Sequence, residues 1–204
     1  MGYLFAILGG YLLGCSNMAF YLEKITKKSV RGGGSGNLGA SNAVIRLGWL
    51  AGVLGGAHDI VKALLAVYIT KWLLPGQEYA AAAAGVACVR GHIFPFYLKF
   101  RGGKGFASYV GMIFALDWKI SLAIILMIFV VTLITDYIVA ATVMTTVSAP
   151  LSLGLCQRKW ILAMILLIAS GVILYRHKEN LVRIFVTGDE IGLRSAAGGE
   201  HRAK

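Results

Sequence analysis

The sequence predicts an all-α polytopic membrane protein with about seven transmembrane helices, an N-terminus outside and a cytoplasmic C-terminus. Hydrophobic residues make up 58% of the 204, the mean hydropathy is +0.74, and only 14% of the residues are charged. This composition is far more apolar than that of a water-soluble domain. The apolar residues fall into runs long enough to cross a bilayer, and the basic residues lie mainly between those runs.

The net charge of +11 would suggest nucleic-acid binding in a soluble protein. Here the basic residues are divided among the segments between apolar runs, without the basic faces and stacking aromatics of nucleic-acid binders. The positive-inside rule explains such a distribution directly. We therefore expect a membrane lipid environment and no nucleic-acid partner.

Each span is predicted from an apolar run that ends at a polar or glycine-containing turn. In the first run, Gly10 and Gly14 have the GxxxG spacing that allows close helix packing. The fourth run is too short for a full bilayer, so either the bilayer thins there or the preceding loop dips below the membrane surface, and we favour the dip. The predicted spans are Tyr3–Leu22, Leu50–Leu74, Tyr79–Leu98, Phe106–Leu116, Ile120–Thr135, Tyr137–Leu155 and Trp160–Tyr175.

The orientation follows from the basic residues after the first span, Lys24, Lys27, Lys28 and Arg31, which mark the cytoplasmic side. Seven crossings then place the N-terminus outside and the C-terminus inside. Residues 1–190 are predicted to form a single transmembrane domain. Residues 191–204 lack an apolar pattern, so we expect them to form a disordered tail.

Asp59 and Lys62 lie inside the second predicted span. Ionisable groups there are costly and are usually functional or paired with each other. Residues three apart share a helix face, so these two can form an internal ion pair. We favour that interpretation over a catalytic dyad.

Three polar clusters, Arg31–Gly48, Lys99–Gly105 and Arg176–Asn180, fall on the predicted cytoplasmic side. The positive-inside rule accounts for their basic residues but not for the glycine runs and asparagines. Glycine-rich backbone can turn its N–H groups toward an anion. The first cluster also leads into a helix near Ser41–Asn42, whose free amides would add positive charge. We infer a shared site for a phosphate-bearing ligand.

The clusters closely resemble the motifs of the bacterial acyl-phosphate:glycerol-3-phosphate acyltransferase family. The resemblance covers the chain from Tyr3 to about Glu190, and Asp59 and Lys62 match a pair typical of that family. It rests on the segments Ser35–Asn42 with Arg46, Gly91–Pro95 with Lys99–Gly105, and Arg176–Asn180.

The resemblance implies a multi-pass enzyme of the bacterial inner membrane with its active site on the cytoplasmic side. It would transfer a fatty acyl group from acyl phosphate to the 1-hydroxyl of glycerol 3-phosphate. The products would be lysophosphatidic acid and inorganic phosphate, in the first step of phospholipid synthesis. The family uses neither acyl carrier protein nor CoA as donor, and no cofactor or metal site is expected.

The resemblance also assigns residues to the site. The phosphate groups would be bound by Ser35, Arg46 and the Gly102–Gly105 loop with Lys104, and glycerol 3-phosphate would be held by His177 and Asn180. The candidate catalytic residues are Ser35, His92 and His177. The expected substrate-binding residues are Ser35, Asn37, Asn42, Arg46, Gly102, Gly103, Lys104, Gly105, His177 and Asn180.

Three questions stay open in the sequence. Acyl phosphate has a good leaving group, so positioning and charge stabilisation could supply most of the catalysis without a covalent intermediate. The base could be His92, His177 or a phosphate of the substrate, while His92 could equally pack the end of the third span. Ser35 is interpreted as a hydrogen-bond donor to phosphate rather than a nucleophile. The competing class is a transporter of a phosphorylated metabolite, which would commonly show related halves and more polar residues at the midplane.

Overall fold

The computed structural model describes residues 1–187, and all regular secondary structure in that range is helical. The predicted tail, residues 191–204, lies outside the described residues. The α-helices are α1 (Gly2–Cys15), α2 (Met18–Thr26), α3 (Ala40–Leu47), α4 (Trp49–Leu73), α5 (Ala80–Ile93), α6 (Phe106–Leu116), α7 (Trp118–Thr135), α8 (Ile138–Gln157) and α9 (Trp160–Val182). A 3₁₀ turn, Phe96–Leu98, follows α5, and a π-helical turn, Arg183–Thr187, follows α9.

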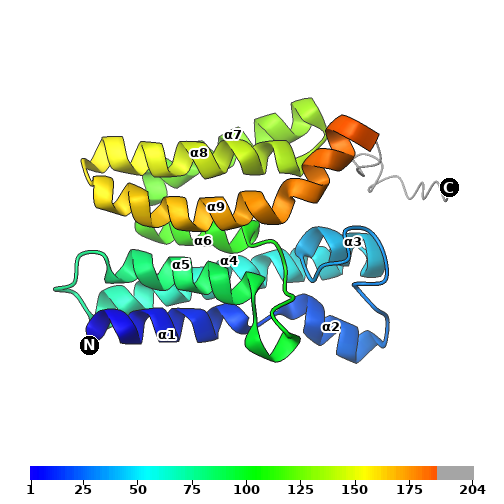
Figure 1. Ribbon diagram of the computed structural model, residues 1–204, viewed down its shortest axis with the longest axis horizontal. Coiled ribbons are helices and arrows are strands. Elements are labelled where there is room, and N and C mark those ends of the chain that lie inside the picture. The colour runs from blue at the N-terminus through cyan, green and yellow to red at the C-terminus, as the bar shows by residue number, and fades with distance from the viewer. Residues whose placement is uncertain (188–204) are drawn as a thin grey trace.

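The long helices form a bundle of two layers (Figure 1). In one layer α1 packs against α5 and α4, and in the other α8 packs against α7 and α9. The short helix α6 lies between the layers and contacts α4, α5 and α7. Helices α2 and α3 lie near the end of the bundle at which α9 ends, and this end receives the polar loops (Figure 1).

The structure contains six segments that are long and apolar enough to cross a membrane within the described residues, not the predicted seven. The difference is α6, which has 11 residues as the short fourth run predicted. The start of α1 and the end of α9 nevertheless lie at opposite ends of the bundle (Figure 1). That the loop before α6 dips below the membrane surface stays a prediction.

The first span is not the single helix Tyr3–Leu22 expected from hydropathy, because the helix breaks between α1 and α2. Asn17 caps α2: its side chain accepts a hydrogen bond from Phe20 N at 2.9 Å. The break frees two carbonyls, and both find donors from other helices. Tyr97 donates to Cys15 O at 2.8 Å, and Lys62 Nζ donates to Ser16 O at 2.6 Å.

The close packing predicted from Gly10 and Gly14 is confirmed between α1 and α5. A Cβ at Gly10 would overlap the backbone of Ala84, and a Cβ at Gly14 would overlap that of Cys88. Backbone cannot retract as a flexible side chain can. The two glycines therefore set the distance between α1 and α5.

Replacing Gly14 with valine is expected to lower the free energy of unfolding by about 1–3 kcal/mol, because the added methyls force the helices apart. Thermal melting of the detergent-purified protein, followed by circular dichroism, measures this. Gly9→Val is the matched control, since a Cβ at Gly9 meets no atom within 4 Å. Equal melting temperatures for the two variants would contradict the packing argument.

Candidate active site

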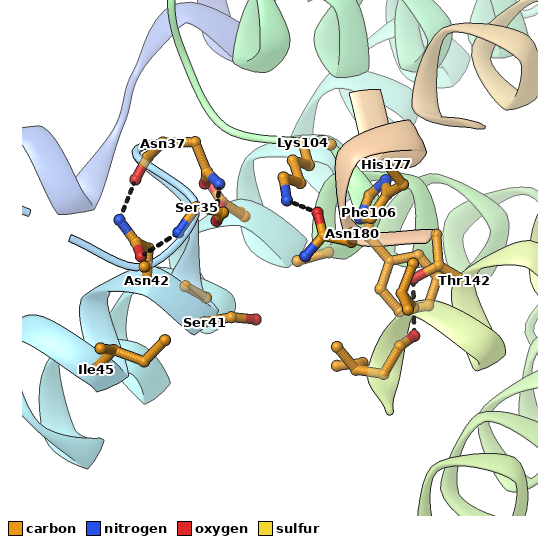
Figure 2. A pocket seen from close by; sticks show the side chains of 18 of the residues that line it. Ser35, Asn37, Ser41, Asn42, Ile45, Lys104, Phe106, Thr142, His177 and Asn180 are labelled. Atoms are coloured by element: carbon orange, nitrogen blue, oxygen red, sulfur yellow. Dashed lines mark hydrogen bonds between the residues drawn. The ribbon is translucent and has the colours of Figure 1, made fainter. Parts of the chain in front are cut away.

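A cavity of about 290 Å³ lies at the end of the bundle where the polar loops meet. The glycine-rich loop and α3 face the start of α6, the start of α8 and the end of α9 across it (Figure 2). The three sequence clusters therefore converge on one cavity. Its lining includes the predicted site residues Ser35, Asn37, Asn42, His92, Lys104, Gly105, His177 and Asn180.

The glycine-rich loop is folded around the buried side chain of Asn42. The Asn42 amide donates to Val30 O at 2.6 Å and to Asn37 O at 2.9 Å, and it accepts from Ser35 N at 3.3 Å. Gly34 has φ of +58°, a conformation that L-residues rarely adopt. Both amide hydrogens of Asn42 are used inside the loop, so the side chain shapes the cavity wall.

Ser35 lines the cavity, and a hydrogen bond from a neighbouring side chain orients its hydroxyl group (Figure 2). Its Oγ accepts a hydrogen bond from Asn37 Nδ2 at 2.5 Å. A hydroxyl that accepts one bond still has its own hydrogen to donate. This arrangement suits a hydrogen-bond donor to an anion.

The Gly102–Gly105 loop is attached to the last turn of α5 through its backbone. Gly102 N donates to Ile93 O at 3.0 Å and Gly103 N donates to His92 O at 3.1 Å. These two amides satisfy helix carbonyls, so they do not cradle a ligand. A Cβ at Gly102 would overlap His92 O, which explains why glycine is needed there.

The backbone groups of this cavity that suit an anion come instead from two helix ends that open into it. Gly39, Ala40 and Ser41 line it at the start of α3, and Gly105, Phe106 and Ala107 line it at the start of α6. The first N–H groups of a helix have no intrahelical acceptor and carry partial positive charge. Helix N-termini are thus ready anion sites. The start of α3 was predicted from the sequence, whereas the contribution of α6 was not.

The end of α9 brings His177 and Asn180 to the same cavity. The predicted last span, Trp160–Tyr175, continues as helix to Val182, so residues three apart project from one face. Lys104 donates a hydrogen bond to Asn180 Oδ1, joining the α6 loop to α9 (Figure 2). His177 Nδ1 lies 2.9 Å from Ile173 O, and because a carbonyl only accepts, Nδ1 carries the proton.

The ion pair predicted between Asp59 and Lys62 is present, with Nζ and Oδ1 2.8 Å apart. The structure adds His92, whose Nδ1 is 2.8 Å from Lys62 Nζ and 3.1 Å from Asp59 Oδ1. Asp59 and His92 both line the cavity. No sequence spacing links residues of α4 and α5, so this cluster was not predicted.

Three of the predicted residues do not line this cavity. Arg46 is exposed on the outside of the glycine-rich loop, where its Nε donates to Ser29 O at 3.2 Å. Gly103 lies against the Nε2 edge of the His92 ring, and Gly102 lines a neighbouring cavity. Sequence reasoning missed Arg183, which lines the main cavity. Its spacing of three and six residues from Asn180 and His177 was the available signal.

The neighbouring cavity, of about 310 Å³, is strongly basic. Ser35, Asn37 and Lys104 belong to both cavities and form the wall between them. Two adjoining cavities with a shared lysine can hold two anionic groups side by side. The basic side chains that line this second cavity are Arg31, Arg101, Lys104, Arg176 and Lys178.

Comparison with known proteins agrees with this geometry. The sequence model of the glycerol-3-phosphate acyltransferase family matches residues 4–187. A glycerol-3-phosphate acyltransferase of Geotalea daltonii is 34% identical over 180 residues, which cover 87% of this chain and 91% of the relative. One of Pelagibacter ubique is 35% identical over 185 residues, covering 90% and 94%.

Two crystal structures of PlsY (YgiH), described as an integral membrane glycerol 3-phosphate acyltransferase, share the fold. The glycerol 3-phosphate form superposes with a TM-score of 0.88 at 30% identity, covering 95% of this chain and 96% of that one. The lysophosphatidic acid form gives 0.85 at 30% identity, covering 96% and 97%. Together with the cavity in which all three motifs meet, these matches show that the chain belongs to the glycerol-3-phosphate acyltransferase family of integral membrane enzymes.

Proposed function

We propose that the protein transfers a fatty acyl group from acyl phosphate to the 1-hydroxyl of glycerol 3-phosphate, which yields lysophosphatidic acid and inorganic phosphate. The observation that carries this proposal is the pair of helix N-termini and Lys104 around one cavity, beside a second basic cavity. Both substrates bear phosphate groups, and this site offers two places for them. Structures of the relative PlsY in glycerol 3-phosphate and lysophosphatidic acid forms support the acceptor and the product.

In the proposed reaction the glycerol hydroxyl oxygen attacks the acyl carbonyl carbon and the bond from that carbon to the phosphate oxygen breaks. The proton of the hydroxyl ends on the departing phosphate, so the reaction needs no net proton exchange with the protein. Catalysis then consists of positioning and of stabilising negative charge. Ser35 and Lys104 would bind phosphate oxygens, and His177 with Asn180 would hold glycerol 3-phosphate.

His177 remains a candidate for the first acceptor of the hydroxyl proton. With the proton on Nδ1, a neutral His177 has its lone pair on Nε2 and can accept a hydrogen bond. A substrate phosphate oxygen is the alternative acceptor. Arg46 would act indirectly, by holding Ser29 and the outer side of the glycine-rich loop.

We further propose that this end of the bundle faces the cytoplasm of a bacterial inner membrane, with residues 1–190 as a single transmembrane domain. The basic residues of the three clusters gather here, as the positive-inside rule requires. The start of α1 lies at the other end, which supports an outside N-terminus if α6 completes a seventh crossing (Figure 1). Acyl carrier protein and CoA are not expected as donors.

A donor assay tests the proposal. Purified protein in detergent should release inorganic phosphate from acyl phosphate only when glycerol 3-phosphate is present, and mass spectrometry should detect lysophosphatidic acid. Acyl-CoA and acyl–acyl carrier protein should give no product, because neither carries the phosphate leaving group that the site binds. Product from acyl-CoA at a comparable rate would overturn the proposed donor.

A further inference from the structure

His92 is the cavity side chain whose hydrogen-bonding role the sequence leaves open. Its side chain is 3% exposed, yet it lines the main cavity. Nδ1 faces the buried pair Asp59 and Lys62. Nε2 lies beside Gly103, where an added Cβ would overlap it.

The position of the ring proton of His92 can be inferred from the hydrogen bonds that the Lys62 ammonium group donates. An ammonium group has three hydrogens to donate and no lone pair. Lys62 Nζ has three acceptors in reach, since it lies 2.6 Å from Ser16 O, 2.8 Å from Asp59 Oδ1 and 2.8 Å from His92 Nδ1. The other acceptor within reach of an Nδ1 proton, Asp59 Oδ1 at 3.1 Å, has no hydrogen-bond partner among the described residues, whereas Lys62 Nζ is within hydrogen-bond distance of Nδ1. Nδ1 is therefore the acceptor, and the ring proton resides on Nε2.

His177, the other histidine that lines the main cavity, is the opposite tautomer to His92. His177 donates from Nδ1 to Ile173 O, which leaves Nε2 as its acceptor. The cavity thus receives one imidazole donor and one imidazole acceptor. The two rings come from different helices, α5 and α9.

We propose that Lys62 is a positioning residue that holds His92 as the Nε2–H tautomer, and that this N–H donates to a phosphate oxygen in the main cavity that His92 lines. His92 is then an anion-binding donor and does not act as the base. The identity of the anion as a substrate phosphate rests on the proposed function, whereas the tautomer does not depend on it.

Nitrogen NMR of the histidine-labelled, detergent-purified protein tests the tautomer without any substrate. The His92 signals are assigned by their loss in His92→Asn. We expect the proton on Nε2 and a bare Nδ1 at neutral pH, and we expect inorganic phosphate to shift the Nε2 resonance. A proton on Nδ1 would overturn the proposal, as would an unmoved Nε2 resonance when calorimetry shows that phosphate binds.

Two substitutions of His92, measured in the phosphate-release assay, distinguish a hydrogen-bond donor from a general base. His92→Asn keeps an acceptor for Lys62 but removes the donor at the Nε2 position, so kcat/KM should fall about 10- to 100-fold. His92→Gln places an amide N–H near the Nε2 position and should recover part of that loss. The acid side of the kcat pH profile should be the same in both variants as in the wild type. If both variants lost the decrease in kcat at acidic pH, His92 would be the base.

Lys62→Met tests the positioning role, because without the ammonium His92 can donate from Nδ1 to Asp59. Nε2 would then present a lone pair to the phosphate, and kcat/KM should fall as in His92→Asn. The double variant should be no worse than the single ones, since both remove the same donor. Additive losses would contradict the proposal. Lys71→Met is the matched control: Lys71 lies in α4 like Lys62, its Nζ donates to Ala115 O at 2.5 Å and it does not line the cavity, so kcat/KM should stay within about twofold.

Discussion

Replacing Lys104 with methionine is expected to lower kcat/KM for phosphate release by about 100- to 1,000-fold, the effect of removing a directed charge donor from an active site. Lys104 belongs to the wall shared by both cavities and is bonded to Asn180. Methionine has a similar length but no charge and no donor. The variant therefore loses an ammonium that could serve both phosphate groups, and it leaves Asn180 without that partner.

Lys28→Met is the matched control for Lys104→Met. It removes the same charge from an exposed position near the same end of the bundle, but Lys28 lines neither cavity. Steady-state kinetics of both variants, with melting temperatures to confirm folding, measures the difference. A folded Lys104→Met enzyme with activity near that of Lys28→Met would show that the cavity is not the site of phosphate binding.

Asp59→Asn is expected to lower the free energy of unfolding by about 3–5 kcal/mol, because it leaves the Lys62 ammonium buried without its counter-charge. The side chains of Asp59 and Lys62 are only 6% and 5% exposed. Lys62 also bonds Ser16 O at the break between α1 and α2, so its displacement should loosen three helices together. Thermal melting in detergent and the yield of monodisperse protein measure the loss.

Glu78→Gln provides the comparison for Asp59→Asn. Glu78 forms an exposed ion pair with Lys159, with Oε1 and Nζ 3.0 Å apart, and solvent-exposed pairs contribute little to stability. We expect its melting temperature to stay close to that of the wild type. If Asp59→Asn instead melts like the wild type but has no turnover, then Asp59 and Lys62 act as a catalytic dyad rather than an ion pair.

The helical architecture was largely predictable because hydrophobic run length is a local property. The runs that predicted the later spans correspond to α7, α8 and α9 within a few residues at most starts and ends, although α9 extends beyond Tyr175. Gly10 and Gly14 predicted a close helix contact, and the structure confirms it against α5. The six long spans, in place of seven, follow from the brevity of α6, which the sequence also showed.

The details of the site were less predictable, because they depend on which groups satisfy each other's hydrogen bonds in three dimensions. Asn42 was expected to bind substrate, yet its amide hydrogens close the glycine-rich loop. The amides of Gly102 and Gly103 bond to the end of α5, and Arg46 lies outside the main cavity. Hydropathy also did not predict the helix break, since one asparagine cap decides it.

The sequence by itself determined that this protein is a helical membrane protein with three polar, glycine-containing clusters suited to phosphate, since composition, run length and motif are properties of the chain. The tertiary structure decided which of those groups meet. It brought the starts of α3 and α6 to one cavity and placed His92 against Asp59 and Lys62. Hydrogen-bond pairing between distant helices depends on packing and has no local sequence pattern, so only the folded bundle could show which ring nitrogen of His92 faces Asp59 and Lys62.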